Sequence, residues 1–242
     1  GLIMRSNETL TEEMIKMILL HNNIFLTGMN KANHNRLALF LYTEMMKTFY
    51  KTLFLFLLLL TGSSLAIADN VQKGNRLYNE GKYQEAISYY IKPDAVEKPS
   101  VMNRIAYMYD KGRGVQENPQ EAYKWYRKAA EAGFAASQFN LGLMYQHGIG
   151  TSKDLIKAIE WFRKAAEQKY PDAEMKLGYL TVEGIGIEKD YKEAMKWYRR
   201  AAEHGDAGAY ADIGVFYDKG NGVKKDPNRA VQYYILGAEK GD

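Results

Sequence analysis

Apolar side chains in the larger, C-terminal part of the chain fall at helical spacing, in segments of two alternating kinds. In the first kind, represented by Leu141, Met144 and Tyr145, they stand at i, i+3 and i+4, which places them on one face of a helix. In the second kind, represented by residues 122–129, they stand at i, i+3, i+4 and i+7, again on one face. The pattern predicts an all-α chain built from pairs of amphipathic helices.

The helical pair repeats along the sequence with a step of 36 residues. A Gly-x-Gly pair recurs at Gly112 and Gly114, Gly148 and Gly150, Gly184 and Gly186, and Gly220 and Gly222. An aromatic pair recurs in the same phase, from Trp125-Tyr126 to Tyr233-Tyr234. Self-similarity at a fixed step is typical of stacked supersecondary units. We expect units at residues 100–135, 136–171, 172–207 and 208–242, preceded by a divergent unit with a shorter loop at 69–99.

The loop inside each unit contains residues suited to a tight reversal followed by a new helix. Glycine tolerates positive φ, so the Gly-x-Gly pair lets the chain turn sharply. A side-chain oxygen then stands where it can cap the second helix, at Asn118, Asp154, Asp190 and Asp226. The second helix is expected to end at Gly133, Gly205 and Gly241. Lys169 interrupts this series, and Pro171 is expected to end the helix there.

Glycine also recurs inside the first helix of three units, at Gly142, Gly178 and Gly214. A glycine inside a helix costs up to about 1 kcal/mol relative to alanine, so its recurrence predicts close contact with a neighbouring helix. The expected partners are the small residues Ala158, Ala194 and Ala230.

Together these motifs resemble the Sel-like repeat (SLR), a subclass of the tetratricopeptide superfamily. The similarity is carried by residues 141–150 (LGLMYQHGIG) and 158–167 (AIEWFRKAAE), and by their counterparts throughout residues 100–242. Residues 69–99 resemble an ordinary tetratricopeptide unit. The resemblance implies an α/α solenoid, coiled as a right-handed superhelix, whose first helices line a concave surface. It also implies a non-catalytic scaffold or adaptor, which in bacteria is often exported.

The N-terminal part of the chain contains a pattern typical of a secretory signal peptide. A short basic stretch is followed by an apolar one and by a small-x-small end at 66–68. Residues 46–68 are interpreted as a signal peptide cleaved after Ala68, which predicts a periplasmic or secreted protein with no stable membrane anchor after cleavage. The alternative is a membrane anchor at 52–68. Residues 1–45 are interpreted as an upstream extension outside the functional protein.

The composition argues against several kinds of active site. The 242 residues include no cysteine, which excludes disulfides, thiolate metal sites and a cysteine nucleophile. No serine is followed three residues later by lysine, as a β-lactamase-like nucleophile would require. His147 and His204 lie in different units, without a metal-ligand spacing, and are expected to be surface residues. We therefore predict no catalytic residue, no cofactor and no metal site.

The charged residues do not indicate a nucleic-acid partner, because they are interspersed and the formal net charge is only +4. Basic pairs align from unit to unit, at Arg127-Lys128, Arg163-Lys164 and Arg199-Arg200. These pairs have two interpretations: they bind an anionic partner or, more simply, their positive charges complement the dipole of each helix.

The predicted partner site lies on the first helices, at positions outside the apolar stripe that differ between units. These positions are Arg104 and Tyr107, Asn140 and Leu143, Lys176 and Tyr179, and Asp212 and Val215. Varied chemistry on a regular array is suited to recognising a specific partner, although such positions are also ordinary solvated surface. The expected ligand is a protein or peptide in the concave groove, and the alternative is a cell-wall glycan, either peptidoglycan or an exopolysaccharide.

Overall fold

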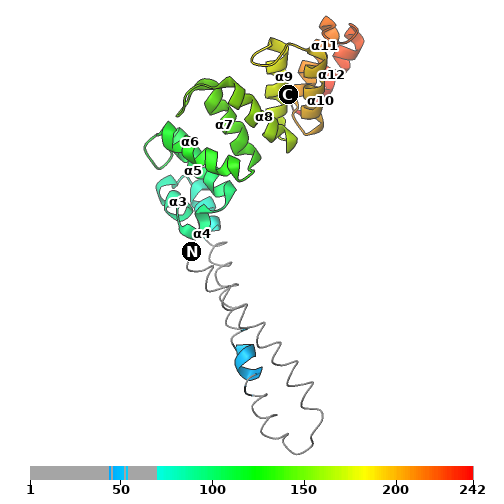
Figure 1. Ribbon diagram of the computed structural model, residues 1–242. Helices are drawn as coiled ribbons and strands as arrows, with labels where there is room; N and C mark the ends of the chain where they lie inside the picture. The colour runs from blue at the N-terminus through cyan, green and yellow to red at the C-terminus, as the bar shows by residue number, and fades with distance from the viewer. Residues whose placement is uncertain (1–43, 45, 52, 54–69, 242) are drawn as a thin grey trace, which may run out of the picture. The chain divides into compact units, whose positions relative to one another are not determined.

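The computed structural model describes residues 44, 46–51, 53 and 70–241 (Figure 1). These residues form helices joined by turns, with no strand among them. Residues 70–79 are helical, and the elements that follow are α3 (Tyr83–Tyr90), α4 (Pro93–Val96), α5 (Pro99–Lys111), α6 (Pro119–Glu131), α7 (Ala135–His147), α8 (Leu155–Glu167), α9 (Pro171–Glu183), α10 (Tyr191–Glu203), α11 (Gly208–Lys219) and α12 (Pro227–Lys240). All of these helices belong to the second of two units of the chain, residues 65–242.

Each long repeat is a hairpin of two helices. α5 packs against α6, α7 against α8, α9 against α10 and α11 against α12, and each hairpin also packs on the next. Figure 1 shows the hairpins following one another in chain order from α5 to α12. This arrangement confirms the predicted all-α class and the α/α solenoid.

The core forms where the predicted apolar stripes meet. Leu141, Leu177 and Ile213, at the same position of three successive first helices, are at most 1% exposed. The second helices contribute buried aromatic side chains at Tyr126, Phe162 and Tyr198. Burying a large apolar side chain contributes roughly 1.5–3 kcal/mol, so contacts within and between neighbouring hairpins stabilise the stack.

The loop chemistry predicted from the sequence is confirmed. Side-chain oxygens accept hydrogen bonds from backbone N–H groups in the first turn of the second helices, at Asn118, Asp154, Asp190 and Asp226. The first helices end at glycines in the left-handed conformation, at Gly112, Gly148, Gly184 and Gly220. The ends of a helix leave backbone N–H and C=O groups without partners inside the helix. The loop residues supply hydrogen bonds to such groups at the end of the first helix and at the start of the second.

Replacing Asp154 by alanine is expected to lower the free energy of unfolding by about 1 kcal/mol, because Asp154 Oδ1 accepts the backbone N–H of Lys157 at 3.0 Å. The matched control is Lys157→Ala, which keeps this cap and removes the exposed ion pair to Asp154 and the contact of the ammonium with the Tyr145 ring. The control should cost less than about 0.5 kcal/mol. Urea unfolding followed by circular dichroism measures both, and equal losses would contradict the capping role.

The second glycine of each loop lies against the preceding hairpin. A Cβ added to Gly150 would collide with the carbonyl oxygen of Pro119 at the start of α6. A Cβ added to Gly222 would lie 2.8 Å from the carbonyl carbon of Tyr191 at the start of α10. Both glycines have positive φ, 67° and 66° respectively. The position therefore requires glycine for its conformation and for the contact that joins successive hairpins.

The glycines inside the first helices contact aromatic rings. A Cβ added to Gly142 would lie 2.5 Å from the ring of Phe162, and one added to Gly178 would lie 2.7 Å from the ring of Tyr198. The expectation that Ala158, Ala194 and Ala230 are the main partners is wrong. Of these alanines only Ala158 is among the nearest contacts, through its backbone oxygen at 3.1 Å from the added Cβ. The glycine makes room for a large ring on the paired helix.

The turn after α8 forms without glycine. Lys169 itself takes the left-handed conformation, with φ 62°, like Gly133 and Gly205 after α6 and α10. The expectation that Pro171 ends the helix is wrong, because Pro171 is the first residue of α9. Proline suits that position, since the N–H that it lacks would have no partner within the helix.

The segment before the long repeats is irregular. α3 ends at Tyr90, and Pro93 begins the short helix α4 that leads into α5. Of the predicted extension at 1–45 the structure describes only residue 44, and of the predicted signal peptide at 46–68 it describes only residues 46–51 and 53. Among the helices that the structure describes, none has the length and apolar character needed to cross a membrane.

Candidate functional site

The eight residues predicted to face a partner occupy equivalent positions on the first helices α5, α7, α9 and α11. They are Arg104, Tyr107, Asn140, Leu143, Lys176, Tyr179, Asp212 and Val215. We call them the first-helix row. None of them is buried, and Tyr179 is the most accessible, with 48% of its surface exposed. Accessibility is the first requirement of a contact surface.

At the N-terminal end of the first-helix row, two arginines lie among tyrosine rings. The Arg104 guanidinium lies 4.8 Å from the ring centre of Tyr78. The Arg113 guanidinium lies 5.1 Å from the ring centre of Tyr107 and donates a hydrogen bond of 2.9 Å to the Tyr78 hydroxyl. Attraction between a cation and an aromatic face orients both arginines. We call Tyr78, Arg104, Tyr107 and Arg113 the arginine–tyrosine cluster.

The arginine–tyrosine cluster is a positively charged surface. In the part of the chain that the structure describes, neither Arg104 nor Arg113 has a carboxylate at ion-pair distance. The hydrogen bond to Tyr78 raises the pKa of Arg113, so this side chain stays cationic. A guanidinium carries five N–H donors, more than these contacts use. The cluster can therefore bind carboxylates or backbone carbonyls of a partner.

The sequence analysis predicted Arg104 and Tyr107 as site residues but did not identify Tyr78 and Arg113. Tyr78 belongs to the divergent unit, and Arg113 lies in the loop of the next unit, so only the folded chain brings them together. One signal for Arg113 is present in the sequence. It stands between two loop glycines, where the other units have Ile149, Ile185 and Asn221.

Further along the first-helix row the chemistry changes. Leu143 packs against the buried core of its own hairpin and the next one. The Lys176 ammonium lies 5.8 Å from the ring centre of Tyr179. Asp212 and Val215 occupy the corresponding positions on α11. The row thus alternates: its first and third units are cationic and aromatic, whereas its second is polar and aliphatic and its fourth acidic and aliphatic, which gives it an order that a partner can match.

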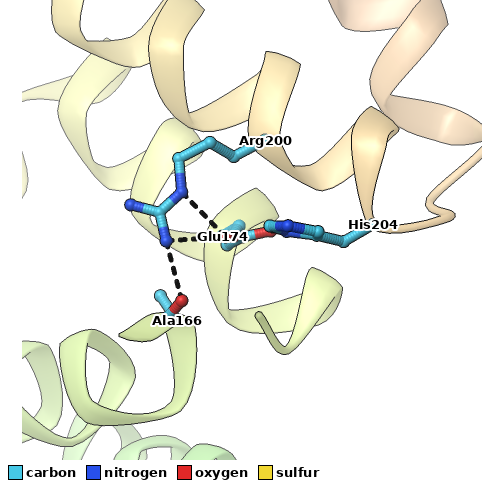
Figure 2. A network of polar contacts seen from close by, with 4 residues as sticks. All are labelled: Ala166, Glu174, Arg200 and His204. Carbon is cyan, nitrogen blue, oxygen red and sulfur yellow. Dashed lines mark hydrogen bonds and ion pairs between the residues drawn. The ribbon is translucent and has the colours of Figure 1, made fainter. Parts of the chain in front are cut away.

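An ion-pair network around a buried carboxylate joins α8, α9 and α10 (Figure 2). Glu174 is fully buried, accepts a hydrogen bond of 2.9 Å from Arg200 Nε, and has its Oε2 2.7 Å from His204 Nδ1. Arg200 also donates to the backbone oxygen of Ala166 at 2.8 Å. The expectation that both histidines are surface residues is therefore wrong for His204, whose side chain is only 21% exposed, whereas His147 is exposed.

Neutral side chains fill the same place in the preceding hairpin. Gln138 donates to the backbone oxygen of Ala130 at 3.2 Å and accepts a hydrogen bond of 2.7 Å from Gln168. Gln138 and Gln168 correspond in the repeat to Glu174 and His204. Because a neutral pair and an ionic network serve the same position, we assign the network a structural role. No group of three or more His, Asp or Glu side chains within the described residues is placed to hold a metal ion.

Several side chains of the aligned basic pairs form contacts with other residues of this chain. Arg127 forms an ion pair of 2.7 Å with Glu131, and the Lys164 ammonium lies 3.9 Å from a ring centre of Trp161. Arg200 belongs to the buried network. These local contacts favour the interpretation that the pairs support their helices over the interpretation that they form a continuous anion-binding ridge.

The repeated hairpins define the chain as an α/α solenoid. The family model of the Sel1 repeat matches this chain over residues 99–134, 135–170, 171–206 and 207–242, which together make up more than half of its length. The chain belongs to the Sel1 repeat family. Proteins of this family are generally non-catalytic scaffolds for protein interactions.

Solved structures show the same architecture. A Sel1 repeat protein from Oxalobacter formigenes is 67% identical, with a TM-score of 0.70, over 71% of this chain and 70% of that one. A protective antigen present in uropathogenic Escherichia coli strains, which displays an SLR fold, is 30% identical with a TM-score of 0.67, over 73% of this chain and 38% of that one. An immunity protein from Pseudomonas aeruginosa, 22% identical with a TM-score of 0.50 over 70% and 65% of the two chains, shares the fold. No curated protein matches the chain.

Proposed function

We propose that this protein is a non-catalytic scaffold that holds a protein or peptide along its first helices. The observation that carries the proposal is the first-helix row, in which accessible positions differ in chemistry from unit to unit on a regular framework. The general role of Sel1 repeat proteins supports the same conclusion.

The framework is suited to an extended partner. Contacts such as that of Gly150 with Pro119 fix each hairpin against the next, so the positions of the first-helix row keep a constant spacing. A preformed surface loses little conformational entropy on binding. The arginine–tyrosine cluster would receive acidic or carbonyl groups, Leu143 and Val215 apolar side chains, and Asp212 a cation or an N–H donor. Recognition would then depend on the order of groups along the partner.

The proposed location is the periplasm or the exterior of the cell. This rests on the leader-like sequence 46–68, with cleavage after Ala68. The similar E. coli protein is a protective antigen, which supports a location outside the cytoplasm.

Tyr179 favours a second candidate, the binding of peptidoglycan or an exopolysaccharide. Sugar rings stack on accessible aromatic faces, and the Tyr179 ring is accessible with the Lys176 ammonium beside it. In this alternative the same surface is used, but the ligand is a cell-wall glycan.

The two candidates are separated by capture from envelope extracts and culture supernatant, with residues 69–242 immobilised and the retained material identified by mass spectrometry. The scaffold proposal predicts one protein that is retained by the parent chain and lost from the double variant Tyr107→Glu, Tyr179→Glu. Loss is expected because each substitution removes an aromatic contact surface and places a carboxylate beside Arg113 or Lys176, where it would compete with the partner for the cation.

The matched control is Ile156→Glu on α8, where a charge replaces a side chain that is 72% exposed and lies outside the first-helix row. This variant should retain the same protein. Retention of peptidoglycan or polysaccharide and of no protein would overturn the scaffold proposal in favour of the glycan candidate. Equal loss in the control would show that the first-helix row is not the site.

A further inference from the structure

A hollow of about 490 Å³ lies between α10, α11 and α12, and no residue of the first-helix row lines it. Two arginines, Arg199 and Arg229, lie on its wall together with Tyr217 and Tyr233. Ile213 and Leu236 add apolar surface. The hollow therefore combines two cations with aromatic and aliphatic side chains.

Both guanidinium groups point at one oxygen atom. Arg199 donates to the Tyr217 hydroxyl at 3.1 Å, and Arg229 donates to the same hydroxyl at 3.3 Å. A hydroxyl that accepts two hydrogen bonds still has its own proton to donate. The three groups together offer a convergent set of N–H and O–H donors, which is the arrangement that binds an oxyanion.

The positive charge of this hollow is not neutralised in the part of the chain that the structure describes. Neither Arg199 nor Arg229 has a carboxylate at ion-pair distance there, although Glu203 lies at the edge of the hollow. Two like charges held near one hydroxyl repel each other, and an anion between them would remove that repulsion.

In an earlier unit of the same chain, the cations at the corresponding positions are paired with carboxylates. Arg127 and Lys157 stand at the positions of Arg199 and Arg229, two repeats before them. There each cation has its own carboxylate, because Arg127 pairs with Glu131 at 2.7 Å and Lys157 pairs with Asp154 at 2.8 Å. The arrangement of two cations without carboxylate partners between α10 and α12 is thus not shared by that earlier unit.

Two further residues that line the hollow also differ from the preceding unit. Leu236 stands where the preceding unit has Arg200, and Tyr210 stands where it has Glu174. The ion-pair network that occupies this region in the third hairpin cannot form in the fourth. The rings of Tyr217 and Tyr233 stack instead, with centres 5.4 Å apart, and form a flat wall.

We propose that this hollow is a second binding site, which takes a carboxylate attached to an apolar group. The carboxylate would lie between Arg199, Arg229 and the Tyr217 hydroxyl, with the apolar group against Tyr233 and Leu236. The site is independent of the first-helix row and does not rest on the proposed scaffold function. Its ligand chemistry is that of an acidic peptide side chain beside an apolar one, or of a small aromatic acid.

The test is a titration of residues 69–242 with phenylacetate, followed by protein NMR chemical shifts, with phenylacetamide as the uncharged ligand of the same shape. We expect phenylacetate to bind and to shift signals of α10 to α12, and phenylacetamide to bind at least tenfold more weakly. Arg229→Gln should weaken phenylacetate binding at least tenfold. Arg163→Gln, at the position of Arg199 one unit earlier, is the matched control and should leave it unchanged.

Equal binding of the two ligands, or unchanged binding in Arg229→Gln, would overturn the proposal. A parallel titration with acetyl-Phe-Glu-amide and acetyl-Phe-Gln-amide shows whether the carboxylate comes from a peptide side chain or from a small aromatic acid. Tighter binding of the glutamate peptide than of phenylacetate assigns the hollow to an acidic peptide side chain, and the reverse assigns it to a small acid. The variant Tyr107→Glu, Tyr179→Glu should bind phenylacetate normally, so failure of this site and failure of the scaffold proposal give different results.

Discussion

Replacing Arg200 by alanine is expected to lower the free energy of unfolding by about 3 kcal/mol, because it leaves a buried carboxylate without its cation. Glu174 is fully buried, and Arg200 supplies both the ion pair of 2.9 Å and the link to the Ala166 backbone oxygen. His204 alone would remain beside the carboxylate. Urea denaturation at neutral pH, followed by far-UV circular dichroism, measures the loss.

A double variant shows whether the buried charge is the cause. Adding Glu174→Gln to Arg200→Ala removes the charge and places glutamine where the preceding hairpin has the buried Gln138. We expect the second substitution to recover about half of the lost stability or more, since a neutral amide costs less to bury than an unpaired carboxylate. If Glu174→Gln lowered the stability of the Arg200→Ala protein further, packing of the arginine stem and not its charge would explain the loss.

Replacing Gly150 by alanine is expected to lower the free energy of unfolding by about 2–4 kcal/mol, from two causes that add. The residue has φ 67°, a conformation in which a Cβ is strained. The added Cβ would also collide with the backbone oxygen of Pro119, which cannot move aside as a flexible side chain could. The variant should separate the second hairpin from the first.

Gly133→Ala isolates the contribution of backbone strain. Gly133 also has positive φ, 88°, but a Cβ added there would meet no atom within 4 Å. This variant should lose only about 1 kcal/mol. Thermal unfolding of the two proteins in parallel tests the difference. Equal losses would mean that the loop glycine serves the turn alone and that the contact between hairpins contributes nothing.

Local features of the fold could be predicted because they depend on residues close in sequence. The caps at Asn118 and Asp154 and the turn at Gly148 follow from side-chain reach and from positive φ, and all of them are present. Lys169 shows the limit of this approach. It takes the left-handed conformation although it carries a Cβ, in a turn where the N–H groups of Lys169 and Tyr170 donate to the carbonyls of Ala166 and Ala165.

Contacts between helices could be predicted only in outline. The glycine in the first helix correctly indicated a close approach, but the nearest group is the ring of Phe162 and not the small side chain of Ala158. His204 gave no signal at all, because its partner Glu174 lies 30 residues away in sequence. A pairing of that kind depends on how two helices are oriented, which residue spacing does not specify.

The candidate site was predictable to a similar degree. The row position of Arg104 and Tyr107 follows from the repeat, because the period assigns each residue a place on its helix. The arrangement of Tyr78 and Arg113 around them arises between units and could not be derived. The hollow beside Tyr217 likewise needs three helices to be in place.

The most direct test of the scaffold account is photocrosslinking from the first-helix row. p-Benzoylphenylalanine replaces Tyr179 in one variant and Ile156, which is more exposed but lies outside the row, in the other. Both chains are irradiated in envelope extract, and the products are identified by mass spectrometry. The account predicts a crosslink to one protein from position 179 and none to that protein from position 156. A crosslink from position 156 alone, or capture of glycan without protein at position 179, would contradict it.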